Sequence, residues 1–321
     1  MTEEQKEVVS ETTGPSIEII NEFVSGIEAK MGLLGKLRMD KYGFEAWSIS
    51  KMKVFQKCPL QFLLKYILKI KVPAEVGGRE DSLAADVGSS GHRILELIML
   101  EETLPDAFAI TKREFVPSKL TEQQWVDLVE NMEMSVTNFK ERMDNFARRN
   151  PIKTVYTEKR LAVTKDWKQC GFFDKEAFFR GVVDLSIHVK ANDLVIIDHK
   201  TGGGDGGIRV YSSQLNSYKP LFHHGLVGVN GAQSGIHFIR AQDVQMGQYS
   251  PRSEIEGKLV KELEWEISGA VAKVEELGFF KHIAGPYCKW CDYASVCKSK
   301  QKFLKPLELD SKKLIPITAV F

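Results

Sequence analysis

The sequence predicts an α/β fold in which a central mixed sheet is flanked by helices. Three changes of pattern along the chain support this prediction. Apolar residues recur at helical spacing over residues 48–73 and 121–149. They then alternate with polar residues over 155–163 and 177–189, which is the period of a strand. From residue 194 onward, short apolar runs alternate with helical patterns, as in chains that build a partly parallel sheet.

The chain begins with a segment that we expect to be a helical extension, residues 1–40. Its amphipathic stretch, 17–31, has helical spacing and precedes a Gly-Leu-Leu-Gly-Lys linker. A total of 321 residues allows one large core with insertions. We therefore treat residues 41–321 as the main domain.

The first half of the main domain is predicted to be helical. The other face of helix 48–73 is basic, and it carries Lys51, Lys57, Lys65, Lys69 and Lys71. A glycine-containing loop, 77–88, should lead into a second helix. A helical insertion, about 100–150, follows, and its helix 121–149 opens with Thr-Glu-Gln-Gln, which resembles a capping box.

The second half of the main domain supplies the sheet. Residues 191–193, Ala-Asn-Asp, give turn chemistry between strand 177–189 and a short apolar run, 194–197, that is typical of a buried strand. The remaining elements are a glycine-rich loop at 202–207, a helix at 211–224, a strand at 235–239 and a long amphipathic helix at 254–277.

Composition excludes few classes of function, but the pattern of apolar residues indicates a cellular compartment. Lys and Arg number 44 and Asp and Glu 43, so any affinity for a polyanion must come from local patches. No apolar run is long enough to cross a bilayer, and residues 1–15 lack the basic and apolar regions of a signal peptide. We therefore expect an intracellular, cytoplasmic protein without a membrane partner. In a reducing cytosol, clustered cysteines indicate metal ligands before disulfides.

A carboxylate and lysine constellation follows the apolar run 194–197. Alternation along the strand points Asp198 and Lys200 to the same side and His199 away. Across the presumed hairpin, Asp184 is a second carboxylate in an apolar strand. Two buried carboxylates repel each other unless a cation joins them, and hard oxygen ligands suit Mg²⁺ or Mn²⁺. An ordinary salt bridge between Asp198 and Lys200 is the alternative, but a pair of buried carboxylates is costly without a purpose.

Further polar residues could complete such a site. Gln214 and Tyr218 are four residues apart, on one face of a predicted helix, and could contact the backbone of a substrate. His92 lies near a helix start and could supply an imidazole ligand to a metal. A lone histidine at such a place is also common as a cap or core residue.

A compact cysteine cluster lies near the C-terminus. Cys288, Cys291 and Cys297 need a fourth ligand, for which Cys58 is the natural candidate, with His282 as the choice for a Cys₃His zinc site. Four thiolates favour zinc or an iron–sulfur cluster, and spacing leaves this open. Such a cluster would clamp the ends of the domain together.

The motifs occur in an order that resembles the iron–sulfur branch of the RecB-like PD-(D/E)XK nucleases. The resemblance covers roughly residues 48–300. It rests on Gly-x-x-x-His at Gly88 to His92, Gly-x-x-Asp at Gly181 to Asp184, Asp-x-Lys at Asp198 to Lys200, and Gln-x-x-x-Tyr at Gln214 to Tyr218, bracketed by one cysteine before and three after. Similar sets occur in CRISPR-associated adaptation nucleases and iron–sulfur helicase–nucleases. No Walker-type motif is present, so any unwinding would come from a partner.

The resemblance implies a fold, cofactors and a site. It implies a restriction-endonuclease-like core with a C-terminal iron–sulfur cluster region. It also implies Mg²⁺ or Mn²⁺ on His92, Asp184 and Asp198, with Glu158 at an acidic position that often accompanies these motifs. The same resemblance implies a [4Fe-4S] cluster, with zinc as the lesser alternative, on Cys58, Cys288, Cys291 and Cys297.

The favoured hypothesis is a metal-dependent DNA exonuclease that prefers single-stranded or frayed DNA ends and acts in recombination, repair or replication. The catalytic set is Asp184, Asp198, Lys200, Gln214 and Tyr218, and a basic tail, Lys298, Lys300, Lys302 and Lys305, could track phosphates. A helicase, integrase or single-strand-binding protein could be a partner, and copies could form a homo-oligomer. If the chain is encoded by a phage or mobile element, it would act in the host cytoplasm. The alternatives are a CRISPR adaptation nuclease and a DNA-binding scaffold with little catalysis.

Overall fold

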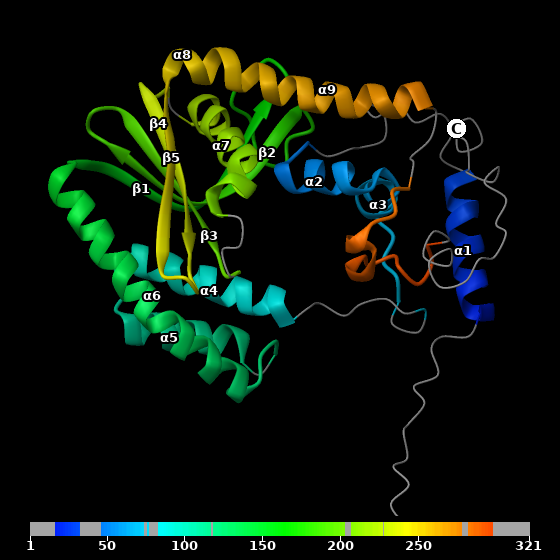
Figure 1. Ribbon diagram of the computed structural model, residues 1–321, viewed down its shortest axis with the longest axis horizontal. Coiled ribbons are helices and arrows are strands. Elements are labelled where there is room, and N and C mark those ends of the chain that lie inside the picture. Colours follow the sequence, from blue (N-terminus) through cyan, green and yellow to red (C-terminus); the bar gives the residue numbers. More distant parts are fainter. Residues whose placement is uncertain are drawn as a thin grey trace, which may run out of the picture. The chain divides into compact units, whose positions relative to one another are not determined.

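The computed structural model describes residues 17–32, 46–73, 76, 83–116, 118–202, 207–226, 228–277 and 282–297. The chain forms two compact units (Figure 1). The first, which we name the sheet unit, comprises Gly43–Lys53 and Asp81–Ala272. The second, which we name the cysteine unit, comprises Met1–Tyr42, Val54–Glu80 and Lys273–Phe321. Each unit is described by itself below, and the predicted boundary between 1–40 and 41–321 stays a prediction.

A five-stranded mixed sheet lies at the centre of the sheet unit, in the order β1-β2-β3-β4-β5. Adjacent strands are antiparallel except β3 and β4, which are parallel. The strands are β1 (Ile152–Thr164), β2 (Ala177–Val189), β3 (Asp193–Lys200), β4 (Gly231–Phe238) and β5 (Asp243–Pro251). The predicted α/β fold with a central mixed sheet flanked by helices is confirmed, and it is consistent with a restriction-endonuclease-like fold.

Helices lie on both faces of this sheet (Figure 1). Val155 of β1 packs into a hydrophobic core shared with the helices α4, α5 and α6, whereas the ring of the next residue, Tyr156, lies 6.0 Å from that of Phe222 in α7. Successive side chains of a strand point to opposite faces, so one face packs on the first three helices and the other on α7. The bounds are α4 (Leu83–Met99), α5 (Leu104–Phe115), α6 (Glu122–Arg149) and α7 (Ser212–Gly225).

The predicted elements of the sheet unit hold with two omissions and one correction. Helix α5 and strand β5 were not predicted as separate elements. The predicted loop 77–88 is wrong in its second half, because α4 begins at Leu83 and both Gly88 and Gly91 lie inside it. A Cβ atom at Gly91 would lie 3.2 Å from Met132 Sδ and 3.3 Å from Thr201 Cγ2. Close packing of α4 against α6 and the end of β3 therefore accounts for a glycine in mid-helix.

The single predicted helix 48–73 is also wrong. The chain forms α2 (Ile49–Lys57), α3 (Pro59–Phe62) and a π-helical turn, η1 (Leu63–Ile67). The break falls at Cys58, whose backbone is extended at φ −160° and ψ 103°, because a proline disfavours the helical conformation of the residue before it. The predicted basic face fails at Lys51, which is buried and donates its ammonium to the carbonyl of Ala46 at 2.8 Å.

Further elements complete the described chain. They are α1 (Ile17–Gly32), η3 (Gly207–Tyr211), α8 (Arg252–Glu254), η4 (Ile255–Leu259), α9 (Val260–Leu277) and η5 (Pro286–Trp290). Helix α1 agrees with the predicted 17–31, and α8, η4 and α9 together form the predicted helix 254–277, interrupted by a π-helical turn. No helix among the described residues is long and apolar enough to span a membrane. The predicted basic tail at 298–305 lies outside the described residues.

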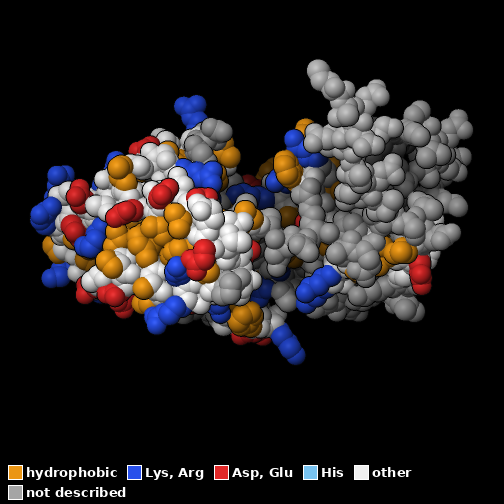
Figure 2. Space-filling model, turned by 90° about the horizontal axis from the view of Figure 1, so that it is seen from below, with side chains coloured by type: hydrophobic (Ala, Val, Ile, Leu, Met, Phe, Trp, Pro, Cys, Tyr) orange, Lys and Arg blue, Asp and Glu red, His pale blue; other side chains and the backbone are white. Residues whose placement is uncertain are grey.

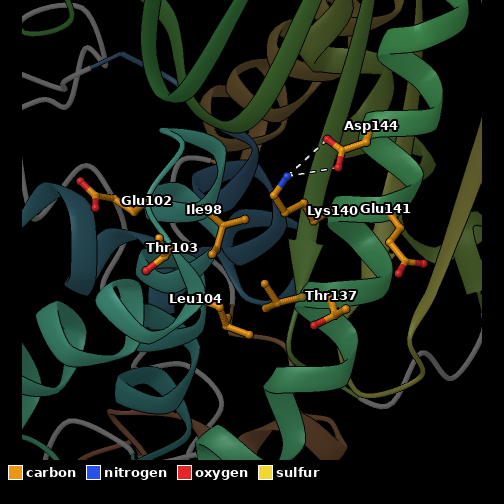
Figure 3. Close-up of a pocket in the computed structure, with 9 residues that line it drawn as sticks. Ile98, Glu102, Thr103, Leu104, Thr137, Lys140, Glu141 and Asp144 are labelled. Atoms are coloured by element: carbon orange, nitrogen blue, oxygen red, sulfur yellow. Dashed lines mark hydrogen bonds and ion pairs between the residues drawn. The ribbon is translucent and has the colours of Figure 1, made fainter.

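The surface of the sheet unit carries no block of one charge on the face shown in Figure 2, where Lys, Arg, Asp and Glu side chains are interspersed around a hydrophobic area. A cleft of about 310 Å³ lies between α4, α5 and α6, and an ion pair of 3.1 Å joins Lys140 and Asp144 at its wall (Figure 3). None of the residues that line this cleft belongs to the predicted active site.

Candidate active site

The carboxylates Asp184 and Asp198 lie opposite each other on β2 and β3. Leu185 of β2 pairs with Ile197 of β3 in antiparallel register. Asp184, which precedes Leu185, therefore faces Asp198, which follows Ile197. Asp198 is 1% exposed, and Lys200 Nζ lies 2.5 Å from its Oδ2 atom. The predicted same-side placement of Asp198 and Lys200 is therefore what the structure shows.

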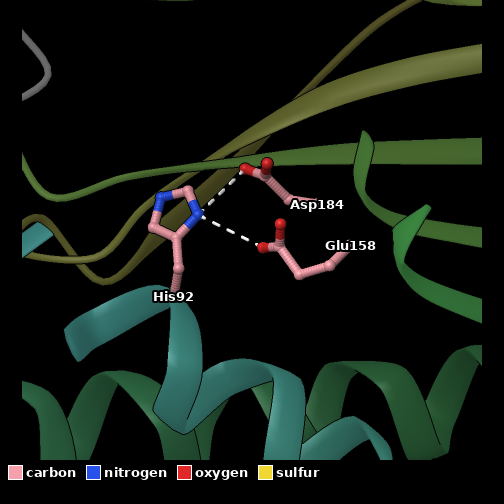
Figure 4. A group of neighbouring side chains, drawn as sticks. All are labelled: His92, Glu158 and Asp184. Atoms are coloured by element: carbon pink, nitrogen blue, oxygen red, sulfur yellow. Dashed lines mark ion pairs between the residues drawn. The ribbon is translucent and has the colours of Figure 1, made fainter. Parts of the chain in front are cut away.

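A third acidic group joins Asp184 from the neighbouring strand. His92 Nδ1 lies 3.6 Å from Glu158 Oε1 and 3.6 Å from Asp184 Oδ2 (Figure 4). One ligand atom from each of these residues lies within 4.8 Å of the other two, and among the described residues no other such group of metal-ligating side chains occurs. Helix α4 and the consecutive strands β1 and β2 thus bring an imidazole and two carboxylates together.

The backbone of His199 orients two of these groups. His92 Nε2 lies 3.1 Å from the carbonyl oxygen of His199, which can only accept a hydrogen bond, so Nε2 carries the proton. The lone pair of a neutral His92 is then on Nδ1, which faces Glu158 and Asp184. The amide of His199 in turn donates to Asp184 Oδ2 at 2.7 Å. The backbone of one residue therefore orients both the His92 imidazole and the Asp184 carboxylate.

Glu158 reaches the site from a strained backbone. Its φ is +45° in the interior of β1, a conformation that L side chains rarely adopt. Such strain costs on the order of 1–3 kcal/mol and collects at functional sites. We infer that the surrounding sheet maintains this distortion because it directs Glu158 towards His92.

Burial and the neighbouring carboxylates together set the pKa values of the group. Burial and the neighbouring Asp198 raise the pKa of Asp184 to about 7, against the opposing effects of His92, the His199 amide and Lys200. Burial lowers the pKa of His92, but Glu158, Asp184 and Asp198 outweigh it and raise that pKa overall. Both pKa values are raised because several carboxylates lie close together in a poorly solvated part of the protein.

Gln214 and Tyr218 contact Asp198 from α7. Gln214 Nε2 donates to Asp198 Oδ1 at 2.8 Å and to the Tyr218 hydroxyl at 2.8 Å, and that hydroxyl lies 3.3 Å from the same carboxylate oxygen. Burial, followed by Asp198 and Asp184, raises the pKa of Tyr218 well above its usual value, so its hydroxyl remains a donor. Both residues are buried. The predicted contact with substrate stays a prediction.

Lys53 fixes which end of the Gln214 amide faces Asp198. Its ammonium donates to Gln214 Oε1 at 2.9 Å. An ammonium can only donate, so the amide oxygen is held at Lys53 and the NH₂ group must turn to Asp198. Lys53 also lies 5.7 Å from the ring centroid of Tyr211, and Lys200 lies 5.5 Å from the same centroid. Two ammonium groups thus lie near one aromatic ring beside the carboxylates.

The family model that matches this chain is the PD-(D/E)XK nuclease superfamily, over residues 46–298. The chain belongs to the PD-(D/E)XK nuclease superfamily. The resemblance inferred from the order of the motifs is therefore confirmed at this level, and the protein is a nuclease of this superfamily.

Solved structures with a similar course include SSO0001, at 11% identity and a TM-score of 0.34, covering 88% of this chain and 97% of that one. A second, named "putative exonuclease", from Eubacterium rectale, has 12% identity and a TM-score of 0.43 and covers 86% of this chain and 94% of that one. The chain matches no curated protein.

The residues of this PD-(D/E)XK site fit a divalent cation. Ligand atoms about 2.1 Å from Mg²⁺ lie roughly 3–4 Å apart in octahedral geometry. His92 Nδ1 lies 3.6 Å from both carboxylates, and all three ligand atoms lie within 4.8 Å of one another. Asp198 Oδ2 is buried and, within the described part of the chain, accepts no hydrogen bond of good geometry, its close neighbour being the Lys200 ammonium. Glu158 joins the cluster directly, whereas the predicted ligand Asp198 borders it.

Several residues of the site were not predicted. Lys53, the backbone of His199 and a buried histidine, His237, have no spacing to the motifs that would reveal them. His237 Nδ1 lies 3.1 Å from His199 Nδ1, and its Nε2 lies 3.1 Å from the hydroxyl of Ser135 in α6. Its ring also stacks on Phe139 at 4.4 Å. This packing fixes His199, the residue of β3 that lies between Asp198 and Lys200.

The predicted cysteine ligands lie in the cysteine unit, where tyrosines tie η5 and the turn after it to the segment around Cys58. The Tyr287 hydroxyl donates to the carbonyl of Lys57 at 2.7 Å, and the Tyr293 hydroxyl donates to that of Ile70 at 2.8 Å. Burial, followed by Cys297 and Cys58, raises the pKa of the Cys291 thiol to about 11. Cys170 lies elsewhere, beside Ala46, Ala162 and Ala177 in the sheet unit. These contacts hold the segment that carries Cys288 and Cys291 near that of Cys58, and the shared cluster stays a prediction.

Proposed function

We propose that this chain is a metal-dependent deoxyribonuclease that hydrolyses phosphodiester bonds, acting as an exonuclease on single-stranded or frayed DNA ends in recombination, repair or replication. One observation carries the proposal: His92, Glu158 and Asp184 converge beside the buried Asp198 and its Lys200 partner. Superfamily membership supports the nuclease chemistry.

His92, Glu158 and Asp184 would hold Mg²⁺ or Mn²⁺, with Asp198 at its edge. When bound, such an ion polarises a phosphate and makes a bound water more acidic. The pKa of Asp184 is raised to about 7 by burial and Asp198, and a bound cation would favour the deprotonated carboxylate. Lys200, held at Asp198, places a positive charge where the phosphate gains negative charge.

Aromatic and cationic groups beside the carboxylates suit an unpaired strand. The ammonium groups of Lys53 and Lys200 lie 5.7 and 5.5 Å from the ring centroid of Tyr211. Lysines track phosphates without regard to sequence, and an aromatic ring can contact a base only where that base is unstacked. This arrangement supports single-stranded DNA as the substrate.

A digestion time course tests the proposal. End-labelled single-stranded and duplex DNA would be incubated with Mn²⁺, Mg²⁺ or EDTA and the wild type, Asp184→Asn, or the exposed control Asp166→Asn. We expect shortening from one labelled end, faster on the single strand, that is abolished by EDTA and by Asp184→Asn and kept by Asp166→Asn. Internal cleavage would replace exonuclease with endonuclease action, and activity that survives Asp184→Asn would place the active site elsewhere.

We also propose that Cys58, Cys288, Cys291 and Cys297 hold a [4Fe-4S] cluster that joins the ends of the cysteine unit. The hydrogen bond from Tyr287 to Lys57 supports this, because it holds the cysteine loop beside Cys58. Thiolates around one zinc ion lie roughly 3.8 Å apart. The spacing of the cysteines along the chain suits either occupant, and the resemblance to iron–sulfur nucleases favours the cluster.

Iron and acid-labile sulfide analysis of protein purified without air tests the cluster. We expect both elements in the wild type and in Cys170→Ser, and their loss in Cys58→Ser. Stoichiometric zinc without sulfide, or equal iron content in the two variants, would refute the cluster while leaving the nuclease proposal intact.

A further inference from the structure

The connection between β1 and β2 ends in an exposed aromatic turn. Asp174 N donates to the carbonyl of Gly171 at 3.0 Å, so Phe172 and Phe173 are the two central residues of a β-turn. Glycine, proline, asparagine and aspartate are the residues usual at such places. Phe173 is 75% exposed. A single exposed apolar ring is ordinary on a protein surface, so the case for a binding role rests on the groups that surround this one.

Two arginines of the neighbouring strands hold this turn. The guanidinium of Arg180 lies 5.0 Å from the ring of Phe172 and 5.8 Å from that of Phe173, and its Nη1 donates to the Phe172 carbonyl at 3.0 Å. The guanidinium of Arg160 lies 5.8 Å from the ring of Phe172. The two rings meet edge to face at 5.1 Å. Phe172 is therefore the inner, braced ring, and Phe173 is the outer ring on a fixed support.

The same strands connect the turn to the active site. Arg160 follows Glu158 by two residues on β1, and Arg180 precedes Asp184 by four residues on β2. At about 3.3 Å per residue, the arginines lie roughly 7 and 13 Å along the strands from these carboxylates. Lys175, Asp174 and Glu176 are the other exposed charged residues of the turn, and the Asp174 carboxylate accepts from the Glu176 amide at 3.0 Å. Positive charge thus prevails between the carboxylates and the aromatic turn.

We propose that Phe173 is a stacking platform for an unpaired base of a single-stranded nucleic acid, whose adjacent phosphates contact Arg160 and Arg180 while the strand runs towards the carboxylates. This inference rests on the proposed function and adds a second contact to it. The occupant follows from the chemistry: a ring exposed on one side stacks on a base that has a free face, and guanidinium groups pair with phosphates. Bases inside a duplex offer no free face.

Equilibrium binding tests the platform separately from hydrolysis. The fluorescence anisotropy of a labelled oligothymidylate of about 12 nucleotides, a length within the site sizes of single-strand-binding folds, would be measured in EDTA with the full chain. We expect Phe173→Ala to bind roughly 5- to 150-fold more weakly, since one stacked base contributes that factor. Phe173→Trp should bind at least as tightly as the wild type. Trp265→Ala, which removes a ring that is 77% exposed on α9, should bind as the wild type does.

Two further probes identify the base and the phosphates as the recognised groups. An abasic oligomer of the same length should bind the wild type and Phe173→Ala equally, because it has nothing to stack. Arg160→Gln should lower the slope of log affinity against log salt by about 0.7, the value for one single-strand phosphate contact. Equal binding of oligothymidylate by the wild type and Phe173→Ala would overturn the platform, as would equal losses on oligothymidylate and the abasic oligomer.

Hydrolysis of a small diester separates this proposal from the proposed function. Bis(p-nitrophenyl) phosphate is too short to reach the turn, so Phe173→Ala should hydrolyse it with Mn²⁺ at the wild-type rate. A wild type that hydrolyses neither this diester nor DNA would refute the nuclease proposal, and the anisotropy results would still decide the platform. A lower rate on the small diester would show that Phe173 shapes the active site, which contradicts a separate platform.

Discussion

Replacement of His237 by glutamine should change how the stability of the protein depends on pH. His237 is 1% exposed and lies against His199, Ser135 and Phe139. Burial, followed by the positive charge of Arg142, lowers its pKa from 6.5 to about 4, with Asp243 opposing the shift. The imidazole is therefore neutral in the folded protein and takes up a proton readily only after unfolding.

The sign and size of the effect of His237 on stability follow from the linkage between protonation and folding. Below pH 6.5 the unfolded chain binds a proton that the folded chain rejects until about pH 4, so the stability contributed by His237 is complete above pH 6.5 and is lost as the pH falls through this window. A shift of about 2.5 units corresponds to about 3 kcal/mol in full, of which about 2 kcal/mol is lost by pH 5. A side chain this deeply buried needs no discount for solvent screening.

Urea unfolding followed by circular dichroism, between about pH 7.5 and about pH 5, measures the effect as a difference between two proteins. Asp184 and His92, whose pKa values are raised, oppose the trend in both proteins and cancel in the difference. We expect His237→Gln to be less stable than the wild type at pH 7.5 and to lose about 2 kcal/mol less than the wild type by pH 5. Parallel pH profiles for the two proteins would show that His237 does not titrate as its burial requires.

Three further predictions concern the site and one helix. Glu158→Gln should weaken Mn²⁺ binding by about 10- to 100-fold in calorimetry, whereas the exposed Glu176→Gln should not; equal affinities would exclude Glu158 as a ligand. Gln214→Leu should lower kcat by about 100-fold with little change in KM, because Asp198 loses the donor that positions it; a change in KM alone would instead indicate substrate contact. Thr121→Ala removes the capping box of α6 and should cost about 1 kcal/mol in urea unfolding without altering kcat; an unchanged midpoint would contradict the cap.

The sequence determined the order of the elements and the place of the central carboxylates. Alternation of apolar and polar residues is a local property, so β2 was predicted with its observed bounds, and a capping box identified the start of α6. The pairing of Asp184 with Asp198 was also predictable, because a short turn joins the two strands and fixes their register. The helix break at Cys58 was not predicted, although Pro59, the next residue, disfavours a helical conformation there.

Only the tertiary structure decided which side chains complete the site. Glu158 enters the cluster through a positive φ that no propensity predicts, and Lys53 reaches Gln214 across 161 positions of the chain. The membership of Lys53, Glu158 and the His199–His237 pair depends on how α2, α4, α6 and the sheet pack together. Motif spacing records neighbours along one element, whereas a metal site and its hydrogen-bonded support are assembled from several. The physical reason is that convergence in space is a property of packing and register, which local sequence patterns constrain only one element at a time.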